Sequence, residues 1–131
     1  MDFSATARPS GIRATRALGD YGERLAVRYL REHGLTIVDR NWRCARGEID
    51  IVALDGGCLV VVEVKTRSTE LFGAPFEAVT RLKLARLRQL STLWRNAADP
   101  GWRTLPVRID VVSILRPRRG PAHIAHLRAV Q

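Results

Sequence analysis

One hairpin signal near the middle of the chain constrains its fold more than any other feature. The segment GEIDIVALDGGCLVVVEVKTR, residues 47–67, contains two largely apolar runs on either side of a Gly-Gly pair. Glycine readily adopts the positive φ angles of two-residue hairpin turns, so the pattern predicts antiparallel strands over 48–54 and 59–66. Pairing outward from this turn places Asp50 directly opposite Glu63.

These two opposed carboxylates need a physical reason, because like charges facing each other destabilise an antiparallel pair. Crowded carboxylates either take up a proton or share a cation, and Mg²⁺ or Mn²⁺ prefers such oxygen ligands. The register therefore predicts a metal site formed by Asp50, Glu63 and the Val64 carbonyl. Lys65 projects from the same strand face as Glu63 and opposite Glu48, where an ammonium can assist a reacting water. The other interpretation is an ordinary ion pair on a solvated sheet face.

Two helices are expected around the hairpin. An apolar stripe with a period of 3.6 residues predicts a first helix from Thr15 to the stop signal at Gly34, and Pro75 suits the first turn of a second. Residues 1–14 lack periodicity, which predicts a flexible basic tail ahead of a single domain over 15–131. The second helix is expected to face the sheet through Val79, Leu82, Leu90 and Trp94.

Further strands are expected over 35–43, 107–115 and 124–130. Strict alternation in the second strand places Ile49 and Ile51 on the same sheet face. The element order is then α-β-β-β-α-β-β. This order predicts an α/β fold in which a mixed central sheet is flanked by helices.

The charge balance favours a polyanionic partner. Twenty-two basic residues against 13 acidic ones give a formal charge of +9, and an excess of that sign is typical of nucleic-acid binding. Lys65 and Lys83 are the only lysines, so arginine supplies nearly all of this charge. No apolar run reaches the roughly 18 residues of a membrane span, and the first residues lack a secretory apolar region. We therefore expect a cytoplasmic protein without a membrane partner.

Several short segments carry a resemblance to known proteins. LGDYGERLAVRYLREHG, RNW, GEIDIVA, VVVEVKTR, FGAP and RIDVV occur in this order over residues 18–112. The set resembles the YraN-like family of small bacterial proteins, and the hairpin resembles the PD-(D/E)xK nuclease signature. That family is similar in fold to archaeal Holliday-junction resolvases. The resemblance implies a restriction-endonuclease-like arrangement of the sheet and helices.

The resemblance also implies roles for five residues. Asp50 and Glu63 would bind the metal, and Lys65 would be catalytic. Glu23, in the helix motif GERLA, corresponds to an acid that resolvase-like members bring to the site from their first helix, and it would join the catalytic metal site by bringing a second ion or more water ligands. Glu48 would bind the metal through water or orient Lys65, and a plain ion pair between Glu48 and Lys65 is an equal alternative.

Six side chains are candidates for contacts with backbone phosphates: Thr66, Arg67, Lys83, Arg116, Arg118 and Arg119. A solvated polar face is the alternative for each. We expect a Mg²⁺- or Mn²⁺-dependent, endonuclease-like phosphodiesterase that acts on DNA rather than RNA, with branched or structured DNA as a candidate substrate. The alternative function is a non-catalytic nucleic-acid-binding module with the same fold. Cleavage of a junction would require a symmetric homodimer.

Two further polar residues have only structural interpretations. Asp110 alternates with apolar neighbours in the 107–115 strand, and it is either a surface acid or a residue at the border of the site. His126 has no partner at metal-ligand spacing, which favours a structural or surface role.

Overall fold

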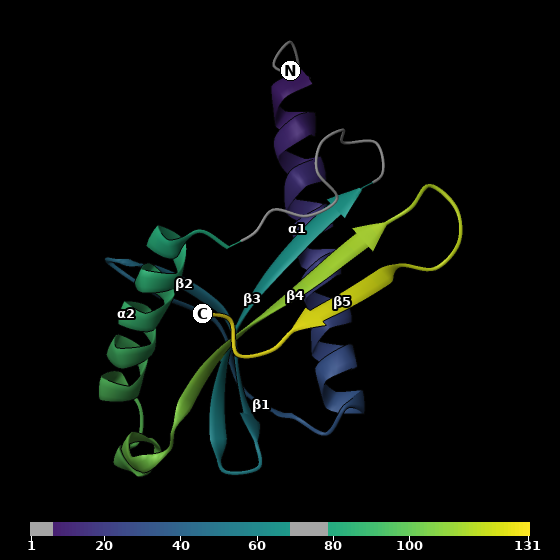
Figure 1. Cartoon of the computed structure of the whole chain (residues 1–131). Coiled ribbons are helices and arrows are strands. Elements are labelled where there is room, and N and C mark those ends of the chain that lie inside the picture. The colour runs from purple at the N-terminus through teal and green to yellow at the C-terminus, as the bar shows by residue number, and fades with distance from the viewer. Residues whose placement is uncertain (1–6, 69–78) are drawn as a thin grey trace.

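The chain folds into a five-stranded sheet with one long helix on each face (Figure 1). The structure, a computed structural model, describes residues 7–68 and 79–131, and it describes side chains from residue 16 onward. The elements are α1 (Ala7–Glu32), β1 (Thr36–Cys44), β2 (Gly47–Asp55), β3 (Cys58–Ser68), α2 (Arg81–Ala97), the 3₁₀ helix η2 (Pro100–Thr104), β4 (Val107–Arg116) and β5 (His123–Leu127). The predicted single α/β domain and its element order are confirmed, and among the described residues the short η2 is the one addition.

The sheet is mixed, with the spatial order β1-β2-β3-β4-β5. β3 and β4 are parallel because the chain crosses between them through α2, whereas the other neighbouring pairs are antiparallel. β3 is the central strand. Its first half, Leu59 to Val62, is buried, as its continuous apolar run predicts.

The core has two layers, because alternate strand residues face opposite helices. On the α1 side, buried residues include Ala26, Val27 and Leu30 from the helix and Ile51, Val60, Val62, Val112 and Ile114 from the sheet. On the α2 side they include Leu84, Leu87, Leu90 and Trp94 from the helix and Val52, Leu59, Val61 and Ile109 from the sheet. The prediction for Leu82 is wrong: its side chain is 74% exposed. Positions 82 and 84 lie about 200° apart around a helix, so only one of them can face the sheet.

Both helix starts differ from the sequence prediction. α1 begins at Ala7 rather than Thr15, so residues 7–14 are helical, and residues 1–6 lie outside the described part of the chain. Pro9 is compatible with this start, because the first helical turn has no use for its missing N–H. α2 begins at Arg81 behind an N-cap at Thr80, whose side-chain oxygen accepts from the Lys83 backbone N–H.

Two further helical predictions concern the end of α1 and the position of Pro75. The predicted stop of α1 is confirmed, since the helix ends at Glu32 and Gly34 has a φ of 89°. The Pro75 position lies outside the described residues. Within the described residues, no helix is long and apolar enough to cross a membrane.

The alternation predicted for β2 is interrupted at Asp50. Ile51 packs in the α1 layer, but Ile49 packs in the α2 layer. The neighbouring strand shows the cause: Asn41, between the partners of these two isoleucines, has a φ of 53°. A left-handed residue breaks the regular pleat. Residues on the two sides of this break therefore do not follow one continuous alternation between the α1 and α2 faces.

The C-terminal part of the sheet contains a buried polar network that the sequence analysis did not predict. Asp110 is fully buried, so its assignment as a surface acid is wrong. Its carboxylate accepts from His126 Nε2 at 2.7 Å, from the Ala129 backbone N at 2.9 Å and from Arg108 Nε at 3.1 Å. His126 also contacts the Tyr29 hydroxyl of α1 through Nδ1 at 3.2 Å. β5 ends at Leu127, earlier than predicted, and the chain bends at Ala129 with a φ of 51°.

Candidate functional site

The predicted hairpin register is confirmed as far as Ile51, which pairs with Val62. At the next residue β2 leaves β3, and the Asp50 side chain bridges the opening. Its Oδ2 accepts from the Val64 backbone N at 2.8 Å. The carboxylate thus occupies the end of the β2–β3 ladder, where a backbone carbonyl would otherwise accept, and it points at β3 beside Glu63.

Asp50 is the residue whose titration the fold changes most clearly. Burial of the carboxyl group is the largest cause and raises its pKa, while the hydrogen bond from Val64 opposes that effect. The negative charges of Glu63, Glu48 and Glu23 raise it further. Together they move the pKa of Asp50 from its ordinary 3.8 to about 7. The carboxyl groups of α1, β2 and β3 that interact here are therefore four: Glu23, Glu48, Asp50 and Glu63.

Glu63 has a counter-ion that the sequence analysis did not assign to it. The ammonium of Lys83, in the first turn of α2, forms an ion pair with Glu63 Oε2. The Glu63 side chain is only 12% exposed, so this contact is partly shielded from water. Lys65 lies two residues further along β3, half-buried and next to Ser113 of β4. Within the described residues no ion pair is formed by Lys65.

Glu23 reaches the site from α1 but is already bound by β1. Its Oε2 accepts from Asn41 Nδ2 at 2.9 Å and lies 3.0 Å from Arg40 Nη2. The left-handed backbone at Asn41 places these donors against the helix. Arg40 and Asn41 were not predicted as site residues, although the RNW segment that contains them carried part of the family resemblance.

Glu48 does not form the predicted pair with Lys65. The β2–β3 ladder ends before it reaches these residues, and Glu48 instead lies 3.9 Å from Arg43 Nη2 of β1. The negative charge of Glu48 still contributes to the raised pKa of Asp50.

The carboxylates fit some metal ions better than others. Within residues 7–68 and 79–131, no three acidic, histidine or cysteine side chains converge as a preformed metal cage. Asp50 and Glu63 nevertheless supply crowded oxygens beside the Val64 peptide, and the Lys83 ammonium shows that the position next to Glu63 accepts a cation. This donor set suits Mg²⁺ or Mn²⁺, which keep several waters and commonly bind through one or two carboxylates.

The predicted phosphate-binding residues occupy different places. β3 continues past its predicted end at Thr66 to Ser68, so Arg67 is also a strand residue. Thr66 faces α1, because a Cβ added at Gly22 would lie only 1.8 Å from its Oγ1. Arg67 lies on the half-buried strand beside Leu115 of β4.

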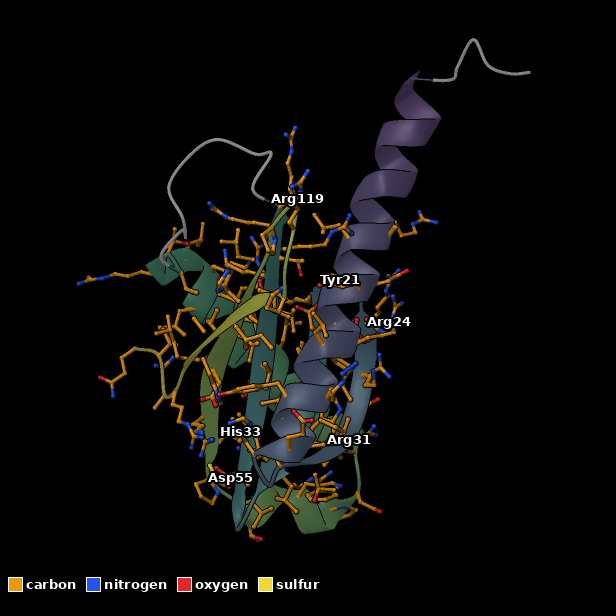
Figure 2. The ribbon with its side chains drawn as sticks, turned by 90° about the vertical axis from the view of Figure 1, so that its right-hand side faces the viewer. Tyr21, Arg24, Arg31, His33, Asp55 and Arg119 are labelled. Carbon is orange, nitrogen blue, oxygen red and sulfur yellow. The ribbon has the colours of Figure 1, made fainter. Side chains whose placement is uncertain are left out.

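Three of the arginines gather at the end of the sheet where β3 and β4 stop. Ser68 pairs with Arg116, whose guanidinium lies 5.3 Å from the ring centroid of Tyr21. Arg118 and Arg119 follow in the exposed β4–β5 turn. Figure 2 shows Arg119 at this end of the molecule and Asp55 at the opposite end. Lys83 is not part of this group, since it contacts Glu63 nearer the middle of β3.

Comparisons with known proteins agree with the family resemblance but add no activity. A model of the uncharacterised protein family UPF0102 matches residues 22–114. A UPF0102 protein of Beutenbergia cavernae is 58% identical over 119 residues, which cover 91% of this chain and 99% of that protein. Similar proteins of Kineococcus radiotolerans and Streptomyces coelicolor are 56% and 50% identical, each over 91% of this chain and over 97% and 92% of their own lengths.

Proposed function

The chain belongs to the uncharacterised protein family UPF0102, and from this premise we propose that it is a metal-dependent phosphodiesterase that cleaves DNA. We further propose that it is a member of the PD-(D/E)xK nuclease superfamily. The observation that carries the proposal is Asp50: a half-buried carboxyl group, with a pKa raised to about 7, among the charges of three glutamates. Such crowding of carboxyl groups is destabilising by itself and is typical of a site that binds a cation.

Each residue of the site has a distinct part in this proposal. Asp50, Glu63 and the Val64 carbonyl hold Mg²⁺ or Mn²⁺. Such an ion supplies Lewis-acid activation of the scissile phosphate and of the attacking water. Asp50 must lose its proton before it can act as a ligand. Lys65 places an ammonium beside the reacting phosphate, where it stabilises developing negative charge.

Glu23 and Glu48 lie around Asp50 and Glu63, and we do not propose them as direct metal ligands. The Glu23 side chain is 12% exposed and is fixed in position by its contacts with Arg40 and Asn41. Glu48 is more exposed, and its charge also acts on Asp50. We assign them outer roles, as acceptors for water that the metal retains.

The arginines at the end of β3 and β4 suit a nucleic-acid backbone. Arg67 lies four positions after Glu63, which is roughly 13 Å along a strand, and Arg116 lies beside Ser68. A duplex that contacts Arg67, which shares a sheet face with Glu63, therefore passes the carboxylates. We propose DNA, including branched or structured DNA, as the substrate in the cytoplasm, with Thr66 as a minor contact because it faces α1. A homodimer would supply the two sites that a junction requires.

The test is cleavage of labelled single-stranded, duplex and four-way DNA with Mg²⁺ or Mn²⁺. Asp50→Asn is the matched control, because an amide oxygen can still accept from the Val64 N–H while the ligand charge is lost. We expect metal-dependent cleavage by the wild type and a loss of at least about 100-fold in Asp50→Asn. Equal cleavage by the two proteins, or no cleavage of any substrate, would refute the proposal.

A non-catalytic DNA-binding module is the second candidate, and one observation favours it. Glu63 and Glu23 are already paired with Lys83 and Arg40, so the fold neutralises part of its own acid cluster. If the protein only binds, salt-dependent affinity for DNA would be unchanged in Asp50→Asn and in Glu63→Gln, and no substrate would be cut.

A further inference from the structure

The N-cap of α2 holds Lys83 in a position that faces β3. Thr80 is the N-cap, and its Oγ1 accepts from the Lys83 backbone N at 3.1 Å. This bond fixes Lys83 in the first turn, where the buried stripe of α2 begins with the adjacent Leu84. Lys83 is therefore held by the helix cap in a position from which its side chain reaches Glu63.

The contact between Lys83 and Glu63 places a cation at the candidate metal position. The two side chains are 42% and 12% exposed, so the carboxylate is mostly enclosed while the lysine retains access to water. Lys83 and Lys65 are the only lysines of the chain, and both lie close to Glu63 in the structure. A lysine ammonium is a compact point charge on a flexible stem, so it can leave a carboxylate more readily than a bidentate guanidinium.

We infer that Lys83 is a positioning residue that occupies Glu63 in the metal-free protein and must exchange with the divalent ion when the metal binds. This inference rests on the proposed metal site. Lys83 occupies Glu63 Oε2 and neutralises the charge of that carboxylate, so the ion pair and the metal compete for it. The exchange also frees an ammonium at the edge of the site, within reach of a phosphate of the bound DNA.

The competition predicts that removal of the Lys83 charge strengthens metal binding. The experiment is a calorimetric titration of Mn²⁺ into the metal-free full chain. Arg86→Met is the control for Lys83→Met, because Arg86 is exposed one turn further along α2 and its loss changes the net charge equally. We expect Mn²⁺ to bind Lys83→Met about fivefold more tightly than Arg86→Met, since a half-exposed ion pair has a modest free energy.

A second variant separates competition from altered folding. Lys83→Gln keeps a polar side chain of similar length, and it should also bind Mn²⁺ more tightly than Arg86→Met. Thermal unfolding without metal checks that the variants fold. The gain should vanish when Glu63→Gln is added to each, because the oxygen for which the cations compete is then neutral.

The outcomes distinguish this inference from the proposed function. Equal or weaker Mn²⁺ binding by Lys83→Met and Lys83→Gln, relative to Arg86→Met, would overturn the exchange, even if the wild type cleaves DNA. A wild type that binds Mn²⁺ with the expected ranking of variants but cuts no DNA would overturn the nuclease proposal alone. The absence of Mn²⁺ binding in every variant would overturn both.

Discussion

At the residue scale, Asp50 ends the β2–β3 ladder and also forms the centre of an acid cluster, and these roles make its protonation state important for stability. The folded protein holds the Asp50 proton up to about pH 7, whereas the unfolded chain releases it near 3.8. Between these values the unfolded state binds fewer protons. The free energy of unfolding therefore contains a contribution that is present at low pH and lost as pH rises through 7.

The variant Asp50→Asn should not show this loss, because its amide does not titrate. A shift of three pKa units corresponds to about 4 kcal/mol of unfolding free energy. We expect the wild type to lose about 2 kcal/mol relative to Asp50→Asn, because Asp50 keeps some contact with solvent. Urea unfolding of chelator-treated protein from pH 4 to 8 measures the difference. The wild type should lose stability relative to Asp50→Asn as pH rises; parallel pH profiles would contradict the raised pKa.

The buried Asp110 gives a second prediction at this scale. Its carboxylate serves His126, Arg108 and the Ala129 backbone N–H. Asp110→Ala leaves the His126 ring and the Ala129 N–H without their acceptor, whereas Arg108 keeps its ion pair with Asp55, and we expect a loss of about 3 kcal/mol in the free energy of unfolding. Urea denaturation measures it, with Asp110→Asn expected to lose less because one acceptor oxygen remains. A cost below about 1 kcal/mol for Asp110→Ala would show that water replaces the network.

At the element scale, the position of α1 depends on one close approach to the sheet. A Cβ at Gly22 would lie 1.8 Å from Thr66 Oγ1 and 2.8 Å from Thr66 Cβ, so α1 must move away from β3 to accept it. Gly22→Ala should therefore cost about 2 kcal/mol or more, despite the better helix propensity of alanine. Because Glu23 is the next residue, the shift should also weaken its contacts with Arg40 and Asn41.

Gly19 provides a matched control for this element-scale prediction. It lies one turn earlier in α1, and nothing lies within 4 Å of an added Cβ. Gly19→Ala should stabilise the protein by up to about 1 kcal/mol through helix propensity alone. Thermal unfolding compares the two variants, and Thr66→Ala should recover part of the Gly22→Ala loss. Equal effects at positions 19 and 22 would mean that α1 does not pack closely on β3.

At the scale of the whole molecule, the basic end of the sheet should set the salt dependence of DNA binding. Arg116→Gln combined with Arg119→Gln removes two charges from this end, whereas Arg28→Gln with Arg31→Gln removes two exposed charges toward the other end of α1. Each lost phosphate contact reduces the slope of log affinity against log salt by about 0.9. We expect the first pair to reduce it by about 2 and the second pair to leave it unchanged. Fluorescence anisotropy measures both, and similar slopes for the two pairs would place the DNA elsewhere.

Local patterns were enough to locate the strands and to determine the hairpin with its pairing as far as Ile51 and Val62. The Gly-Gly turn fixes the β2–β3 register, and the apolar run of β3 predicts its central position, because both depend on short-range geometry and burial. Helix starts were predicted less well. α1 begins at Ala7 and α2 at Arg81, since capping and the position of the sheet decide among several possible first turns.

The sequence by itself determined that Asp50, Glu63 and Lys65 lie on adjacent strands and that the chain is basic. Only the tertiary structure decided the partners of the charged side chains: Lys83 on Glu63, Arg40 and Asn41 on Glu23, and His126 on Asp110. Each of these contacts joins elements far apart in the chain. Spacing along one strand specifies which side chains share a face, but contacts between elements depend on how the helices pack on the sheet and where the pleat of β1 and β2 breaks.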